Sequence, residues 1–378
     1  MPTPVGFLRT SQFVRQYPGA LRRFNHDRFA PKSPLAFVFD IDGVLIKGPN
    51  VLAAAKRVFA KLNGHNPYRL KIPYLLLTNG GGVSEVDRCQ KLSQQLGFPI
   101  SPDQYIQAHT ILKRKCSEYA DKPVLVLGGN PDVVRHVAES YGFQKVYTTL
   151  DILNWNPSVW PFYDVSTTER VSAKIDNFSK VRFSAAFVFH DPLNWGLDVQ
   201  IICDILLSGG IVGGPRVLPG SPMHNSVELV FCSSDLLWGS DFEQPRLGQG
   251  AFKEALLSVY KALTGSAYPY IQYGKPTTAT YNFAEHVMRK LLEKDYGSGT
   301  AMPRLYMIGD NPASDIAGAT AAGWESILVR TGVYDPRQGR PSCNPTHEAK
   351  DVEEAVEWAI KRELADDVSG LPDMAKAE

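Results

Sequence analysis

The chain has 378 residues, which exceeds the size of most single hydrophobic cores and favours two domains. Its apolar content of 44% and charged content of 21% are ordinary for a globular enzyme, and its net charge of +1 gives no reason to expect a nucleic acid as partner. No segment has the length and apolar character of a membrane span. The five cysteines are scattered, which favours reduced thiols inside a cell and argues against a zinc site.

Residues 1–34 differ in composition from the rest of the chain. They contain six basic residues but a single acidic one, Asp27, and their apolar residues could share one face of a helix. An arginine-rich, acid-poor, amphipathic segment is typical of a mitochondrial transit peptide. A basic tail on a cytoplasmic protein is the alternative. We therefore expect an N-terminal extension at 1–34 and a mitochondrial protein.

From residue 35 onward, apolar runs alternate with amphipathic segments. Near-continuous apolar strands separated by helices predict α/β domains with parallel sheets that are covered on both faces. One helix is expected to begin at Ser84, in the capping sequence "SEVD", and to end at Gly97. The runs that we interpret as strands are "LAFVF", "IPYLLLT", "PVLVLGG", "SAAFVFH", "VELVFC", "RLYMIGD" and "SILVRTG".

The middle of the chain, residues 111–248, is rich in tryptophan and proline and has its own alternation of strands and helices. It lies between two blocks that carry polar motifs. We expect it to be an inserted α/β cap domain, with the catalytic core formed by 35–110 and 249–378. A domain inserted between parts of an active site is a candidate lid.

The first polar motif is "DID", directly after the apolar run at 35–39. Side chains alternate across an extended chain, so Asp40 and Asp42 point the same way at the strand end, where open α/β sheets bind ligands. The two carboxylates repel each other unless a cation lies between them or one is protonated. A metal-bound carboxylate can act as a nucleophile and a protonated one as a general acid. A solvated turn is the alternative.

Three further motifs also place polar residues near the ends of strands. In "LLLTNGGG", Thr78 and Asn79 precede three glycines and a helix, which suits an anion site. In "YGKP", Lys275 could neutralise a phosphoryl oxygen or hold two carboxylates together. In "GDNPASD", Asp310 suits Mg²⁺, while Asp315 either supports the site or caps a helix. Taken singly, an ordinary loop and a surface lysine are the alternatives.

Together and in this order, "DIDGVL", "LLLTNG", "GKP" and "GDNPASD" resemble the four motifs of the haloacid dehalogenase-like superfamily. The resemblance covers residues 35–361, and the insertion resembles the large α/β cap of the class IIA phosphatases. Segments such as "DPLNWGLDVQ" and "YIQYGKP" look closest to the cat-eye-syndrome candidate subfamily, hydrolase-like proteins often sent to mitochondria. The resemblance implies a Rossmann-like parallel-sheet core with an inserted cap.

The resemblance also implies roles for the acidic residues. Asp40 would be the nucleophile that forms an aspartyl-phosphate. Asp42 would protonate the leaving oxygen, then activate water, and offer its backbone carbonyl to Mg²⁺. Asp40 and Asp310 would bind the same ion through their carboxylates, and Asp315 would support it from behind.

The remaining candidates would contact the substrate. Thr78 and Lys275 would hold the phosphoryl oxygens, with Asn79 beside them. Asp191 and Trp195 of the cap are further candidates for substrate contact, but turn formation for Asp191 and core packing for Trp195 are the favoured interpretations.

We therefore expect a Mg²⁺-dependent phosphatase that acts on a small phosphorylated metabolite or on a lipid or cofactor head group. An aspartate at position 42 favours phosphatase or phosphotransferase chemistry over that of a dehalogenase. A catalytically silent scaffold or binding protein is one alternative. A phosphomutase is another, which the large cap disfavours.

Overall fold

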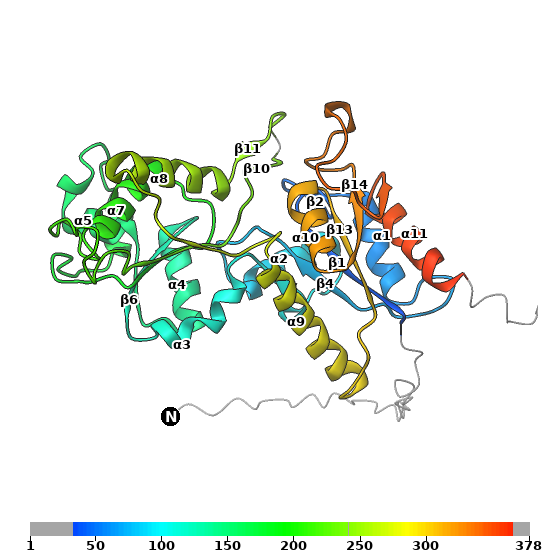
Figure 1. Cartoon of the computed structure of the whole chain (residues 1–378). Coiled ribbons are helices and arrows are strands. Elements are labelled where there is room, and N and C mark those ends of the chain that lie inside the picture. Colours follow the sequence, from blue (N-terminus) through cyan, green and yellow to red (C-terminus); the bar gives the residue numbers. More distant parts are fainter. Residues whose placement is uncertain (1–32, 241, 366–378) are drawn as a thin grey trace, which may run out of the picture. The chain divides into compact units, whose positions relative to one another are not determined.

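The computed structural model describes residues 33–240 and 242–365. The expectations for the N-terminal extension therefore lie outside the described residues, except at its last two positions. Most strands of the described part form two parallel sheets (Figure 1), and all seven predicted strands lie in these sheets. This confirms the predicted α/β class.

The first sheet has six strands, all parallel. Helices α1 (Ala53–Leu62), α2 (Glu85–Leu96) and α11 (Val352–Leu364) pack on one face, and α9 (Thr278–Tyr296) and α10 (Ala317–Ala321) pack on the other. Successive residues of a strand point to opposite faces, so Phe37 belongs to one core and Val38 to the other. The strand order is β15 (His347–Ala349), β14 (Glu325–Val329), β13 (Arg304–Gly309), β1 (Leu35–Phe39), β4 (Tyr74–Leu77) and β5 (Tyr105–Ile106).

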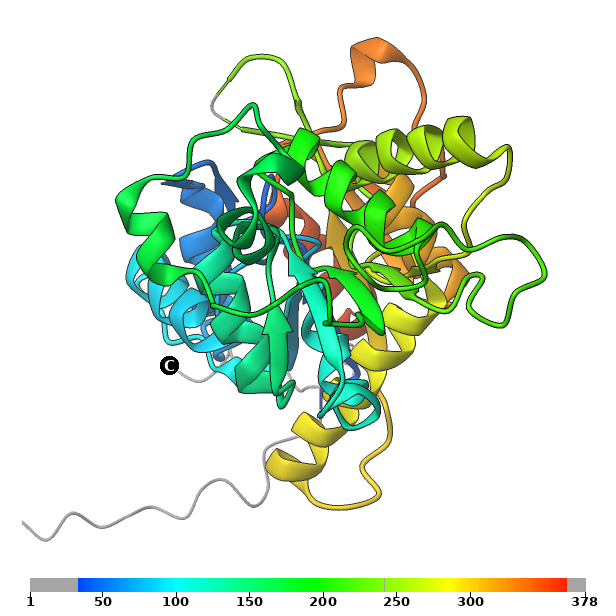
Figure 2. The same ribbon diagram turned by 90° about the vertical axis from the view of Figure 1, so that its left-hand side faces the viewer.

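The second sheet has five strands, also all parallel. Helices α3 (Cys116–Tyr119) and α4 (Pro131–Tyr141) cover one face, while α5 (Thr149–Trp155), α7 (Trp195–Leu207) and α8 (Gln249–Thr264) cover the other (Figures 1 and 2). The short helix α6 (Thr167–Ser172) lies in the segment between α5 and β8. The strand order is β12 (Ile271–Gln272), β9 (Glu228–Phe231), β8 (Ala185–Val188), β6 (Pro123–Leu127) and β7 (Lys145–Tyr147).

The second sheet reaches further along the chain than the expected boundary after residue 248. Strand β12 pairs with β9, where Ile271 lies opposite Val230. Phe252 and Leu256 of α8 pack into the core of the same sheet. Segment 249–272 therefore packs with the second sheet and not with the first, and we propose that the inserted domain ends near residue 272.

Two antiparallel hairpins and five short helical turns complete the described part. The hairpins are β2 (Ile46–Lys47) with β3 (Asn50–Val51), and β10 (Leu237–Trp238) with β11 (Arg246–Leu247). The helical turns are η1 (Pro102–Gln104), η2 (Thr110–Arg114), η3 (Pro157–Val159), η4 (Pro312–Ile316) and η5 (Pro336–Gln338).

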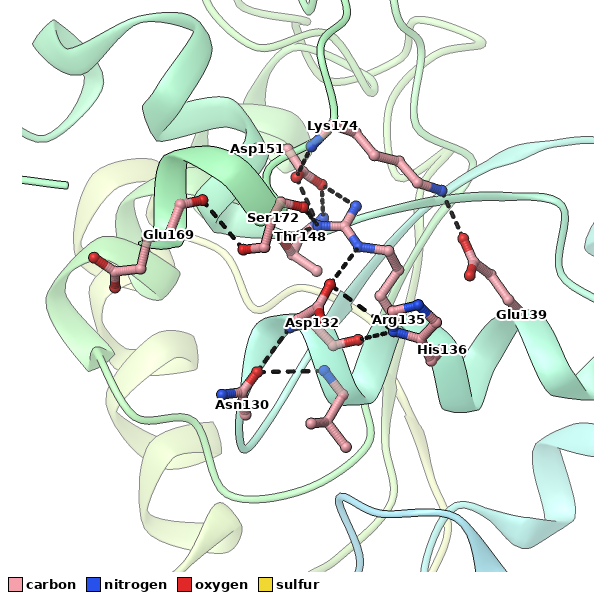
Figure 3. A network of polar contacts seen from close by, with 11 residues as sticks. Asn130, Asp132, Arg135, His136, Glu139, Thr148, Asp151, Glu169, Ser172 and Lys174 are labelled. Atoms are coloured by element: carbon pink, nitrogen blue, oxygen red, sulfur yellow. Dashed lines mark hydrogen bonds and ion pairs between the residues drawn. The ribbon is translucent and has the colours of Figure 1, made fainter. Parts of the chain in front are cut away.

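A buried ion pair joins α4 to α5 in the second domain (Figure 3). The Arg135 guanidinium donates to both carboxylate oxygens of Asp151, at 2.7 and 2.8 Å. The backbone N–H groups of Thr148 and Lys174 donate to the same carboxylate, each at 2.7 Å. Asp151 therefore connects α4 with the start of α5 and with the segment after α6.

Candidate active site

Asp40 and Asp310 directly follow β1 and β13, which are neighbours in the first sheet. The Asp40 backbone N–H donates to the Ile308 carbonyl at 2.9 Å, which extends the ladder to the aspartate. Because parallel strands end at the same edge of a sheet, both carboxylates lie there. Gly43 has a φ of +90°, and a Cβ at this position would lie 2.5 Å from an Asp310 carboxylate oxygen. Only glycine therefore fits here without displacing Asp310.

Lys275 lies between two of the carboxylates. Its Nζ donates to Asp40 Oδ1 and to Asp315 Oδ1, each at 2.6 Å, and the residue is only 2% exposed. Burial disfavours the charge, but the carboxylates of Asp315 and Asp40 outweigh it and hold the pKa of Lys275 well above its usual value. The lysine is therefore a fixed positive charge at this site.

Asp310 is buried and forms no ion pair with any described residue. Its Oδ2 accepts from the Val333 backbone N–H at 2.6 Å. Burial and the neighbouring carboxylates of Asp40 and Asp315 raise the pKa of Asp310 well above its usual value. One oxygen from each of these three aspartates lies within 4.8 Å of the others. With all three carboxyls ionised, the aspartates and Lys275 carry a net charge of −2, so a divalent cation with oxygen ligands fits this cluster.

The pKa of Asp42 is also raised, first by burial and against the opposing charges of Arg88 and Lys275. The side chain is half-buried at the edge of the cluster. A carboxyl group in these surroundings takes up a proton more readily than one in water. Asp42 is thus suited to hold and release a proton beside Asp40.

Thr78 and Asn79 follow β4 at the same edge of the sheet. Thr78 Oγ1 accepts from the Gly80 backbone N–H at 2.9 Å. Asn79 Nδ2 donates to the Lys275 carbonyl at 3.0 Å, and Asn79 Oδ1 accepts from the Lys275 N–H at 2.7 Å. The Asn79 side chain therefore holds the Lys275 backbone, and we propose this positioning role in place of the expected phosphate contact.

Most of the predicted site residues line one cavity, which has a volume of about 400 Å³. Asp191, which follows β8 of the second sheet, is among the residues that line it. Trp195 does not line it; its ring packs edge-on against Phe252, and its Nε1 donates to the Pro192 carbonyl at 3.0 Å. The predicted residues that line the cavity are Asp40, Asp42, Thr78, Asn79, Asp191, Lys275 and Asp310. Asp315 lies behind them, fully buried against Lys275.

Asp235 and Arg88 also line the cavity, although the motifs did not single them out. Asp235 Oδ2 accepts from Asn79 Nδ2 at 2.9 Å, and burial raises the pKa of this carboxyl to about 6. Asp235 could have been found, because it lies three residues beyond the run "VELVFC", past the carboxyl end of a predicted strand. Arg88 lies on the first turns of α2, where the sequence gives no sign that it faces a cavity.

Comparison with known proteins shows which family the chain belongs to. Two family models match, one described as haloacid dehalogenase-like hydrolase at residues 37–144 and one as HAD-hydrolase-like at residues 272–355. The mitochondrial hydrolase YKR070W of Saccharomyces cerevisiae is 38% identical over 349 residues, which cover 87% of this chain and 96% of that protein. The chain belongs to the haloacid dehalogenase-like hydrolases.

Two further proteins are similar to the chain. A Schizosaccharomyces pombe protein named as a fusion of cardiolipin synthase and mitochondrial hydrolase is 37% identical over 340 residues, and the match covers 88% of this chain but only 55% of that protein. The structure of a p-nitrophenyl phosphatase from Archaeoglobus fulgidus superposes with a TM-score of 0.57 and 16% identity, covering 87% of this chain and all of that one. The latter likeness establishes a shared fold. No described helix is both long and apolar enough to span a membrane.

Proposed function

We propose that this hydrolase is a Mg²⁺-dependent phosphatase that cleaves a small phosphorylated metabolite or head group through an aspartyl-phosphate. The observation that carries the proposal is the cluster of Asp40, Lys275 and Asp310, with Asp42 beside it at a cavity. Asp40, Asp310 and the backbone carbonyl of Asp42 would hold Mg²⁺, and Asp315 would support it. The bound ion would neutralise negative charge that builds up on the phosphoryl group.

The proposed reaction has two steps, and both use residues of this chain. In the first, an Asp40 carboxylate oxygen attacks phosphorus, the ester bond breaks, and the proton of Asp42 passes to the leaving oxygen. In the second, Asp42 takes a proton from water as that water attacks phosphorus. The bond to Asp40 then breaks and inorganic phosphate leaves. Lys275 and Thr78 would hold the phosphoryl oxygens, because charge develops there in the transition state.

The relatives extend the proposal to location and substrate. The two relatives described above carry "mitochondrial hydrolase" in their names, which supports a mitochondrial location for this chain. One of them joins such a hydrolase to a cardiolipin synthase, which supports keeping lipid head groups among the candidate substrates.

Hydrolysis of 4-nitrophenyl phosphate tests the proposal. We expect turnover by the purified full-length chain with Mg²⁺, none in excess chelator, and recovery when Mg²⁺ is restored. Full activity in chelator would contradict the metal assignment. No hydrolysis of this ester or of any member of a phosphorylated-metabolite panel would favour the silent scaffold. Transfer of the phosphoryl group within a sugar phosphate, without release of phosphate, would indicate a mutase.

A further inference from the structure

The β10–β11 hairpin exposes an unusual number of large apolar side chains. Leu236, Phe242 and Leu247 are 54%, 62% and 57% exposed, and Leu237 and Trp238 are 38% and 41% exposed. We call these five residues the apolar hairpin. Exposed apolar residues are normal when single, but a contiguous group usually marks a surface that binds something.

The apolar hairpin is continuous with the candidate active site. Leu237 and Trp238 line the same cavity as Asp40 and Lys275. Leu247 lies directly opposite Leu237 in the antiparallel pair, so the two share one face of the hairpin. An occupant of the cavity that is longer than the cavity therefore meets an apolar surface on this side.

Two cations of α2 line the same cavity. Neither Arg88 nor Lys91 forms an ion pair with any described residue. Asp40 and Asp42 line this cavity too, so both cations lie around the same space as the reacting carboxylates. A phosphate monoester bound at Asp40 and Lys275 leaves these cations available to a second anionic group of the substrate.

We propose that the substrate is a membrane lipid whose head group ends in a phosphate monoester and contains a second anionic group. The monoester reaches Asp40, the second anion lies near Arg88 and Lys91, and the apolar hairpin contacts the acyl region at the membrane surface. Tryptophan, phenylalanine and leucine are the residues that interfacial proteins place at this depth. This inference rests on the proposed phosphatase function and narrows its substrate class.

The test compares three substrates of the full-length chain. Phosphatidylglycerol phosphate in phosphatidylcholine vesicles has all three features, its deacylated head group lacks only the acyl chains, and 4-nitrophenyl phosphate also lacks the second anion. We expect kcat/KM for the lipid to exceed that for the head group by at least about tenfold, which corresponds to about 1.4 kcal/mol. The difference should lie mainly in KM.

Substitutions separate the two parts of the proposal. Leu236→Ser with Phe242→Ser, neither of which lines the cavity, should reduce the lipid preference to about threefold or less and leave hydrolysis of the head group unchanged. The matched control is Phe162→Ser with Val171→Ser, which removes apolar residues that are 80% and 82% exposed elsewhere and should keep the preference. Arg88→Gln should raise KM for the lipid and its head group more than for 4-nitrophenyl phosphate.

The outcomes distinguish this inference from the proposed function. If 4-nitrophenyl phosphate is hydrolysed but the lipid is not preferred over its head group, the lipid assignment is wrong and the phosphatase stands. If no phosphate ester is hydrolysed, the phosphatase is wrong. If the hairpin substitutions change the oligomeric state and not the lipid preference, the apolar hairpin contacts a second copy of the chain instead.

Discussion

Neighbouring aspartates of this chain have different surroundings, and these surroundings suit different roles. Asp40 accepts a hydrogen bond from Lys275, whereas Asp42 has no such contact and lies at the edge of the cluster. Burial raises the pKa of both carboxyls, and the largest opposing effect comes from the charge of Lys275 at Asp40 and from that of Arg88 at Asp42. A deprotonated nucleophile beside a protonated acid is the arrangement that phosphoryl transfer to a carboxylate requires.

The first prediction concerns this division of roles. Asp40→Asn should form no phosphoenzyme, because the nucleophile is lost. Asp42→Asn should still become phosphorylated by an aryl phosphate, whose leaving group needs little protonation. The phosphoenzyme of this variant should then be hydrolysed about 10²–10⁴-fold more slowly than that of the wild type, because no side chain activates the water. Intact-protein mass after rapid quench measures the added phosphoryl group. Normal turnover by Asp40→Asn, with the asparagine verified, would place the nucleophile elsewhere.

The second prediction concerns Asp198 of α7, which lies far along the chain from the proposed metal ligands. Burial raises the pKa of its carboxyl from 3.8 to about 6, against hydrogen bonds from Thr149 and the Asn194 backbone. The folded state therefore binds more protons than the unfolded state between these values, and stability falls as the pH rises through this window. Above pH 6, ionisation of this buried carboxyl lowers the free energy of unfolding by on the order of 3 kcal/mol.

Asp198→Asn should consequently stabilise the protein at pH 7.5 and not at pH 4, since the amide oxygen can still accept from Thr149. Thermal unfolding of both proteins at the two pH values measures the effect. Asp164→Asn removes an exposed carboxyl and serves as the control, which should show no comparable pH dependence. An equal change in melting temperature at both pH values would contradict the pKa assignment.

Single residues were predictable from the sequence where they follow a strand or carry a motif, as Asp40 and Asp310 do. The role proposed for Asn79 was not, because its two contacts with Lys275 join positions 196 residues apart. The sequence left two roles open for Trp195, a contact with the substrate or a place in the core. Its packing against Phe252 supports the second role, and this contact has no signal in the sequence. Sequence spacing shows which residues can point the same way, but it does not show what lies opposite them.

At the scale of elements, long periodic segments were predictable and short edge strands were not. Helix α2 begins after Ser84, whose side chain accepts from the Asp87 N–H, and ends at Gly97 in the left-handed region, as expected. Strands β5, β7, β12 and β15 have only two or three residues. A stretch of that length has no periodic pattern, so its pairing depends on the neighbouring strand.

The third prediction concerns the contact between α4 and α5. Arg135→Met would leave the buried carboxylate of Asp151 without its cation, which should lower the free energy of unfolding by about 3–5 kcal/mol. Replacing both partners, as Arg135→Met with Asp151→Asn, should recover part of this loss. Urea denaturation of the full chain measures it. As a control, Glu139→Gln breaks a partly exposed ion pair with Lys174 nearby and should cost less than about 1 kcal/mol. Equal losses in Arg135→Met and Glu139→Gln would mean that burial does not increase the contribution of the Arg135–Asp151 pair to stability.

At the scale of the whole molecule, the inserted α/β unit was foreseeable because its strand–helix pattern lies between the two motif blocks. We propose a later end for it than the sequence suggested, because α8 is amphipathic and fits either sheet by sequence, while its residues pack into the core of the second sheet. The pairing of β12 with β9 is a contact between segments about 40 residues apart, and it has no signal in the local pattern. Both sheets contribute residues to one cavity, so the position of the second domain matters for the chemistry at the first.

The fourth prediction links the metal to the stability of the whole chain. Without a cation, the buried Asp310 repels Asp40 and Asp315, and its raised pKa means that this carboxylate costs stability at neutral pH. Mg²⁺ should therefore raise the melting temperature of the wild type, because a ligand that binds only the folded state stabilises by RT ln(1 + [L]/Kd). At 100 times Kd this amounts to about 2.7 kcal/mol.

Asp310→Asn should be more stable than the wild type in chelator, because one buried charge is removed, and less responsive to Mg²⁺, because one ligand is weakened. Asp310→Asn should therefore have the higher melting temperature in chelator, and the wild type should have the higher one at saturating Mg²⁺. Thermal unfolding across a Mg²⁺ titration measures this, with Asp103→Asn as a control for an exposed carboxylate far along the chain from the cluster. Identical Mg²⁺ responses in wild type and Asp310→Asn would exclude Asp310 as a ligand, even if hydrolysis itself proved to need the metal.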